Sequence, residues 1–234
     1  MLLANKNNQR TRASPNSKAI CPLCNEEVIA KCGEIKIWHW AHKVNFTCKE
    51  FEPETERHIE MKLFFKDNFP NFELEYNLGW AIPDLFDKNR KIAIEVQHSR
   101  LSKEKFLERT INYRKNGIHV LWIFDCFLLK ENVPDFLRKA HELYFGRIYI
   151  YHNKNITPLH FKRKERVIKI NTDFCDIIPE YYDEAGNEFI TSTYKLKREF
   201  YFGNEIIKFN LILVKNNWKE NDYLIARFTD RKFW

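Results

Sequence analysis

A glutamate inside an apolar strand constrains the fold of this chain more than any other feature of its sequence. The run Ile92–Val96 is typical of a buried strand, and Glu95 lies within it. Burying a carboxylate costs free energy unless a cation or hydrogen bonds compensate it. Asp84 precedes this run by a turn-forming stretch, so a bent hairpin can bring the two carboxylates together. We therefore expect Asp84 and Glu95 to bind Mg²⁺ or Mn²⁺, cations that prefer oxygen ligands.

Gln97 extends this candidate site along the strand. It lies two residues beyond Glu95, so both side chains point to the same face. An aspartate followed by Glu-x-Gln on a bent hairpin is similar to the metal-binding core of the PD-(D/E)xK nucleases, where lysine is more usual than glutamine. The alternative is a plain hairpin with one aspartate in its turn and one salt-bridged glutamate, because short motifs often match by chance.

The region 51–130 predicts an α/β core of mixed sheet topology in the order helix, strand, strand, helix, strand. Apolar residues at helical spacing indicate helices over 54–69 and 101–116, the second closed by Gly117. Alternation indicates a strand over 72–78, and short apolar runs indicate strands over 92–97 and 120–124.

Charged side chains on the two predicted helices are further candidates for the site. Glu54, His58 and Lys62 recur every four residues and share one helix face. On this face a carboxylate could bind the metal while His58 or Lys62 contacts a phosphate of the substrate. The alternative is a solvent-exposed helix face on which the three side chains only pair with one another.

The second helix carries the candidate DNA-binding residues Lys105, Arg109, Tyr113 and Arg114. The alternative is an exposed amphipathic helix that buries Phe106 and Ile111.

The first 50 residues predict a zinc-binding module. Cys21-Pro22-Leu23-Cys24 is a Cys-x-x-Cys turn, and a distal set of ligands follows it. Structural zinc takes four such ligands in a closed site. Five candidates compete for the four positions, with Cys32 as a sixth possibility and free thiols as the alternative: Cys21, Cys24, His39, His42 and Cys48.

Beyond residue 130 the pattern changes, and we expect a mainly β accessory region over 131–234. A helix is predicted over 136–143, strands over 147–151 and 157–161 around an Asn-rich turn, and another short strand over 167–170. A turn is expected over 183–187, followed by two more apolar runs.

Charge and hydropathy indicate the kind of partner and the cellular location to expect. The net charge is +7 and the pI about 9.0, which favours a polyanionic partner. Region 51–130 is neutral, so the flanking parts carry the positive excess. Residues 1–18 look like a polar lead-in with one short strand at its start and no signal-peptide core, and no apolar run reaches the roughly 18 residues of a membrane helix. We expect a cytoplasmic protein without membrane contact, whose six cysteines are thiols or metal ligands.

The order of these features resembles the CoiA family of competence proteins from Gram-positive bacteria. The matching stretches run from about residue 19 to 124: CPLC, HWAH, ETERHIEMK, ELEYNL, PDLF, IAIEVQHSRLS and ERTINYRKNGIHVLWIF. HWAH stands where HFAH is more usual, and the part after residue 130 matches poorly. The resemblance implies a zinc module, a PD-(D/E)xK-like nuclease core, and a role in processing or recombining incoming single-stranded DNA. It marks as site residues Glu54, His58, Lys62, Glu75, Asp84, Glu95 and Gln97, with Arg109 and Tyr113 in a downstream helix motif.

We therefore expect a Mg²⁺- or Mn²⁺-dependent deoxyribonuclease with a structural zinc. Its expected partner is DNA, single-stranded by resemblance, with recombination proteins as further candidates. The alternatives are a catalytically silent DNA-binding module of the same fold and a zinc-dependent scaffold for a recombinase-loading protein.

Overall fold

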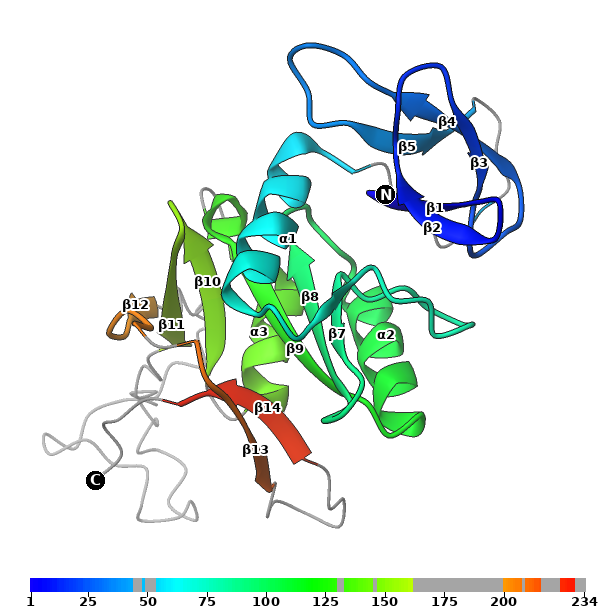
Figure 1. Ribbon diagram of the computed structural model, residues 1–234. Helices are drawn as coiled ribbons and strands as arrows, with labels where there is room; N and C mark the ends of the chain where they lie inside the picture. Colours follow the sequence, from blue (N-terminus) through cyan, green and yellow to red (C-terminus); the bar gives the residue numbers. More distant parts are fainter. Residues whose placement is uncertain are drawn as a thin grey trace, which may run out of the picture.

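The computed structural model describes residues 1–43, 48, 54–129, 133–144, 147–161, 200–207, 209–215 and 224–229. Figure 1 shows a small sheet of N-terminal strands beside a larger sheet with helices on both faces. The predicted strand over 167–170 and the predicted turn over 183–187 lie outside the described residues.

The N-terminal sheet is antiparallel, in the order β2-β1-β3-β4-β5. Asn7 and Asn8 both have positive φ, 50° and 62°, and form the tight two-residue turn between β1 and β2. The short strand expected at the start of the region 1–18 is confirmed by β1, but β2 was not predicted, so this region is part of the sheet and not a lead-in. The strands are β1 (Leu3–Lys6), β2 (Gln9–Arg12), β3 (Lys18–Ile20), β4 (Glu27–Lys31) and β5 (His39–His42).

The larger sheet has the order β12-β11-β10-β9-β8-β7-β6. The three central strands are parallel: β8 pairs with β9, and β9 pairs with β10. The other neighbouring strands of this sheet are antiparallel. The strands are β6 (Glu73–Leu74), β7 (Leu85–Asp87), β8 (Ile92–Gln97), β9 (His119–Asp125), β10 (Ile148–His152), β11 (Asn155–Phe161) and β12 (Phe200–Phe202).

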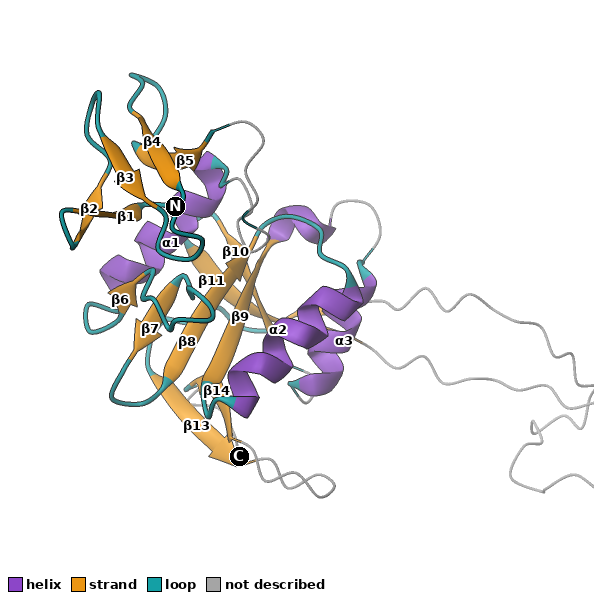
Figure 2. Cartoon of the chain, turned by 90° about the vertical axis from the view of Figure 1, so that its right-hand side faces the viewer, coloured by secondary structure: helices purple, strands orange, loops and turns teal. Residues whose placement is uncertain are grey.

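Helices cover both faces of this sheet (Figures 1 and 2). Ile94 and Val96 of β8 pack in a core with Phe65 of α1, on one face. Ala93 of β8 packs on the opposite face with Phe106 of α2, as the two-residue period of a strand requires. The remaining elements are α1 (Glu56–Asn68), α2 (Lys103–Lys115), α3 (Asp135–Leu143), the 3₁₀ turn η1 (Cys126–Leu129) and a separate hairpin of β13 (Leu211–Lys215) and β14 (Leu224–Phe228).

The predicted helices over 54–69 and 101–116 and the predicted strands over 92–97 and 120–124 are confirmed by α1, α2, β8 and β9, but the order contains one more strand, β7, which the sequence patterns did not predict. Ser102 caps α2 by accepting from the Lys105 N–H, and Gly117 follows its end with φ 68°. The predicted strand over 72–78 is reduced to the two residues of β6, because the chain leaves the sheet at Glu75, whose φ is +48°.

The expected boundary at residue 130 is wrong, because it falls inside one continuous sheet. Strand β10 lies parallel to β9, and α3 packs beside α2. The predicted hairpin is confirmed: β10 and β11 join through Asn153 and Lys154, both with positive φ. In the described part of the chain, no helix combines the length and hydropathy needed to cross a bilayer.

Candidate active site and metal centre

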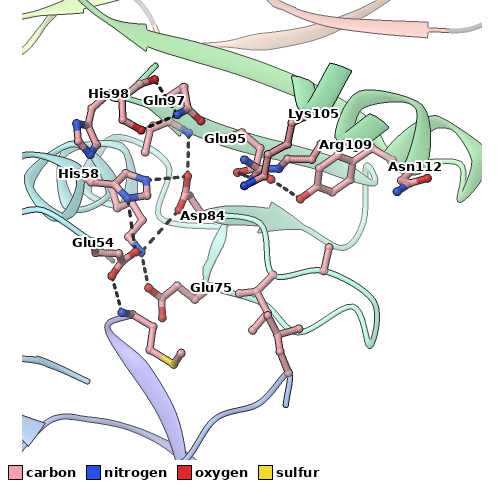
Figure 3. A pocket seen from close by; sticks show the side chains of 18 of the residues that line it. Glu54, His58, Glu75, Asp84, Glu95, Gln97, His98, Lys105, Arg109 and Asn112 are labelled. Atoms are coloured by element: carbon pink, nitrogen blue, oxygen red, sulfur yellow. Dashed lines mark hydrogen bonds and ion pairs between the residues drawn. The ribbon is translucent and has the colours of Figure 1, made fainter. Parts of the chain in front are cut away.

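A cavity of about 260 Å³ lies between α1, the start of β7, the end of β8 and α2. Its walls include all six residues predicted for catalysis (Figure 3). The β7–β8 hairpin pairs Leu85 with Ile94, which brings Asp84 level with the second half of β8. The sequence-predicted residues that line it are Glu54, His58, Lys62, Glu75, Asp84, Glu95, Gln97, Lys105, Arg109 and Tyr113.

Asp84 is buried and held in a fixed position. Its Oδ2 accepts the Val96 N–H at 2.8 Å and lies 3.3 Å from Nε2 of His58. Burial alone would raise the pKa of this carboxyl, but the neighbouring His58 and then Lys62 hold it below its usual range. Asp84 is therefore an anion at neutral pH, as a metal ligand must be.

Three side chains of this cavity can reach one ion. Glu54, His58 and Asp84 each present a ligand atom, and these atoms lie within 4.8 Å of one another. Glu54 precedes the helix, since Thr55 is the N-cap of α1, so the predicted ladder of three residues on one helix starts outside it. Despite burial, Lys62 and the Met1 amino group, 2.7 Å from Glu54, lower the pKa of Glu54. Two carboxylates and an imidazole form a ligand set that suits a divalent cation.

Lys62 is the cation of this cluster. Its side chain is 1% exposed and forms ion pairs with Glu54 and Glu75, with Oδ1 of Asp84 at 3.6 Å. Burial alone would lower the pKa of Lys62, but the Glu54 and Glu75 carboxylates raise it, so the ammonium stays charged. Lys62 thus places a fixed positive charge beside the candidate metal ligands.

Glu75 joins this cluster to the N-terminal sheet. Its carboxylate accepts the Leu2 N–H at 2.8 and 2.9 Å and the Leu3 N–H at 2.8 Å. Arg10 also bonds to the Glu75 backbone carbonyl. The N-terminal sheet is therefore hydrogen-bonded directly to Glu75, one of the carboxylates that surround Lys62.

Glu95 lies in the same cavity but has other partners. The Tyr113 hydroxyl donates to its Oε1, and Arg109 Nη2 lies 2.9 Å from its Oε2. Figure 3 shows its carboxylate turned toward Arg109, while Asp84 turns toward His58. Burial raises the pKa of Glu95, with Arg109 opposing. Glu95 belongs to neither of the two candidate ligand groups found among the described residues, so its role as a metal ligand stays a prediction.

The remaining predicted residues divide between the cavity wall and other positions. Gln97 lines the cavity and donates from Nε2 to the Ser99 carbonyl at 2.9 Å. Lys105 and Arg109 also line it, whereas Arg114 does not.

Tyr113 was predicted to bind DNA; it lines the cavity but is only 2% exposed, so this contact stays a prediction. Its hydroxyl is bound to Glu95. In the alternative interpretation of α2, Phe106 is buried as expected, but Ile111 is 42% exposed.

Trp80 and His98 are among the residues of the cavity wall that the sequence interpretation missed. His98 Nε2 lies 3.0 Å from Thr55 Oγ1, and its ring centroid is 5.6 Å from that of His58. His98 follows directly on Gln97, so the strand signal pointed to its position. Trp80 lies in a loop, where no periodic pattern marks it.

The predicted zinc centre is narrowed to one set of four ligands. The ligand atoms of Cys21, Cys24, His42 and Cys48 all lie within 4.8 Å of one another. His39 is excluded, because residues three apart on a strand point to opposite faces, and its Nδ1 lies 2.9 Å from the Ile37 carbonyl.

The chemistry of these four side chains fits a metal ion. Burial, with the neighbouring Cys24 thiol, raises the pKa of Cys48 to about 12. Crowded thiolates are unfavourable without a cation between them, and a bound metal supplies one. Three sulfurs and one imidazole can hold a metal such as zinc.

Comparison with known proteins finds two family models, one over the N-terminal sheet and one over the region that contains the cavity. Residues 3–51 match the family model "Competence protein CoiA, N-terminal domain", and residues 54–170, half of the chain, match "Competence protein CoiA, nuclease-like domain". A relative from Bacillus subtilis (strain 168), named "Competence protein CoiA", is 29% identical over 144 residues. This match covers 58% of our chain and 38% of that protein, so the chain spans well under two thirds of its length. No solved structure matches. The chain belongs to the CoiA family of competence proteins.

Proposed function

We propose that this protein is a metal-dependent nuclease that hydrolyses phosphodiester bonds in DNA. One observation carries the proposal: the cavity holds a three-ligand group, a buried lysine and the further carboxylate of Glu95, all within the domain that matches the nuclease-like family model. Carboxylates beside a fixed cation are what phosphoryl transfer with a metal ion requires.

We also propose that the core is of the PD-(D/E)xK type. Asp84 begins the hairpin, and Glu95 and Gln97 lie on its second strand with side chains on one face. Helix α2 and the parallel strand β9 follow. Gln97 occupies the usual lysine position, and Lys62 on α1 supplies an ammonium to the same cavity.

The residues of the cavity have separable roles in the proposed reaction. Asp84 would hold Mg²⁺ or Mn²⁺, with Glu54 and His58 in reach and Glu95 after release from Arg109. The bound ion supplies a polarised scissile phosphate and a water of lowered pKa.

The other side chains act on the substrate and the water. Gln97 orients the water, but a neutral amide cannot take its proton. Lys62 stabilises the negative charge that develops on the phosphate. Lys105 and Arg109 hold the DNA backbone from α2.

Zinc is the proposed ion of the N-terminal centre, with Cys21, Cys24, His42 and Cys48 as ligands. Four protein ligands leave no open position for water, so the role is structural. The module is small and its sheet has few apolar core residues, which favours stabilisation by a metal.

One observation favours the catalytically silent alternative. The carboxylate of Glu95 is occupied by Arg109 and Tyr113, so it must exchange partners before it can bind an ion. If that exchange does not occur, the same fold would bind DNA without cutting it.

The test is cleavage of labelled single- and double-stranded DNA by the purified protein with Mg²⁺, Mn²⁺ or EDTA. We expect cleavage with either metal and none in EDTA. Glu95→Gln should abolish cleavage, whereas Glu104→Gln, an exposed residue of α2 outside the cavity, should not. Equal activity in wild type and Glu95→Gln would indicate a contaminating nuclease, and inactivity of both would favour the silent module.

A further inference from the structure

We propose that Trp80 stacks on a nucleobase at the mouth of this cavity, so that the site takes DNA with unpaired bases. This inference rests on the proposed function and assigns to that same site the residue that selects unpaired bases. It assigns a role to a residue that none of the catalytic steps uses.

The position of Trp80 carries the proposal. Its side chain lines the cavity that contains Asp84 and Glu95, yet it remains 36% exposed. Its ring lies edge-on to Tyr113, with centroids 5.2 Å apart and planes at 63°. An aromatic side chain beside a phosphate site offers a nucleobase a stacking surface.

The loop that carries Trp80 is built to hold it in place. Gly79 has φ +87° and donates its N–H to Asn77 Oδ1 at 2.7 Å. The Leu78 N–H donates to the Ala81 carbonyl at 2.9 Å, which closes the turn around Trp80. A fixed ring loses little conformational entropy when a base stacks on it.

The same loop is anchored to the predicted zinc knuckle. Asn77 Nδ2 donates to the Pro22 carbonyl at 3.1 Å, between Cys21 and Cys24. Leu23 of the knuckle also lines the cavity. The N-terminal module therefore supports the stacking residue as well as the Lys62 cluster.

Helix α2 forms the wall that complements Trp80. Lys105 and Arg109 supply positive charge there beside Glu108, and Asn112 supplies an amide (Figure 3). Cationic side chains with an interleaved aromatic ring are the pattern of sites for single-stranded nucleic acid. Inside a duplex both faces of each base are covered by neighbours, so away from the ends a ring can stack only on an unpaired or displaced base. The geometry therefore favours single strands, flaps or frayed ends over intact duplex.

The experiment measures binding with Ca²⁺ as the divalent cation, to separate it from cleavage. The probes are a single-stranded oligonucleotide, the same strand carrying abasic positions, and the duplex. Stacking is worth a factor of roughly 5 to 150 in affinity per base. Trp80→Ala should lose about this factor on the intact strand, and Trp80→Phe should retain most of it. The wild type should prefer the intact to the abasic strand, and Trp80→Ala should bind both alike.

Matched variants keep the result decisive. Trp38→Ala removes another exposed tryptophan, 46% exposed and outside the cavity wall, and should change nothing. If Trp80→Ala fails to fold, Trp80→Leu against Trp80→Phe compares a non-planar with a planar apolar side chain.

An unchanged preference for the intact strand in Trp80→Ala, or in Trp80→Leu, overturns the proposal even if the protein cleaves DNA. A lost preference supports it even if no protein of the series cleaves, which would defeat only the proposed nuclease activity.

Discussion

Replacing Lys62 by methionine tests the charge balance of the candidate site. The ammonium is 1% exposed and lies among the carboxylates of Glu54, Glu75 and Asp84. Methionine nearly preserves the volume of the side chain, so the main effect is electrostatic. Removing one partner of a buried ion pair costs about 3–5 kcal/mol. For a chain of this size, this corresponds to a fall in Tm of roughly 6–20 °C.

The assay is thermal and urea unfolding in EDTA, with Lys139→Met as the control. Lys139 pairs with Glu142 on the surface of α3, and the loss of an exposed pair costs about 1 kcal/mol or less. Because Lys62→Met removes the ammonium that three carboxylates share, Mn²⁺ should raise its Tm more than that of the wild type. Stability of Lys62→Met within about 1 kcal/mol of the control in EDTA would refute the reasoning.

Two further predictions concern the zinc centre and the histidine of the cavity. Cys24→Ser should lower both the Tm and the zinc content measured by elemental analysis. The control Cys32→Ser changes a cysteine of the same module outside the ligand group and should keep about one zinc per chain. Full zinc content in Cys24→Ser would contradict the ligand assignment. Burial alone would lower the pKa of His58, but the Asp84 carboxylate raises it in the folded protein. The ion pair of protonated His58 therefore stabilises the fold fully below about pH 6.5, the pKa of an unfolded histidine. This stabilisation is lost as the pH rises through the higher pKa of the folded state. In EDTA the stability advantage of wild type over His58→Gln should shrink from acidic to alkaline pH, while His152→Gln, an exposed control, should show no such trend; a gap independent of pH would exclude the ion pair.

Local patterns predicted the elements of the core because its strands are short apolar runs and its helices have clear ends. Asp84 and Glu95 were found from a carboxylate in an apolar run and an upstream turn, and both line the cavity. The partners of Glu95 were not predicted. Arg109 and Tyr113 were assigned to DNA because helical spacing gives a shared face but not what that face contacts.

Longer-range pairings explain the other differences. The strands after residue 130 were expected, but a local pattern does not say that β10 will lie beside β9. The hairpin of β1 and β2 was overlooked although its signal was present, since two consecutive asparagines suit a turn with positive φ. His39 and His42 were left as alternatives, and strand alternation was sufficient to choose between them.

The most direct test of the account is cleavage by Asp84→Asn compared with Asp87→Asn. Both aspartates are buried and lie at opposite ends of one short strand segment. Asp87 binds Arg90 and lies outside the cavity, whereas Asp84 belongs to the three-ligand group. With Mn²⁺ and labelled single-stranded DNA, the account predicts cleavage by wild type and Asp87→Asn and none by Asp84→Asn. Cleavage by Asp84→Asn at the wild-type rate, or none by any of the three proteins, would contradict it.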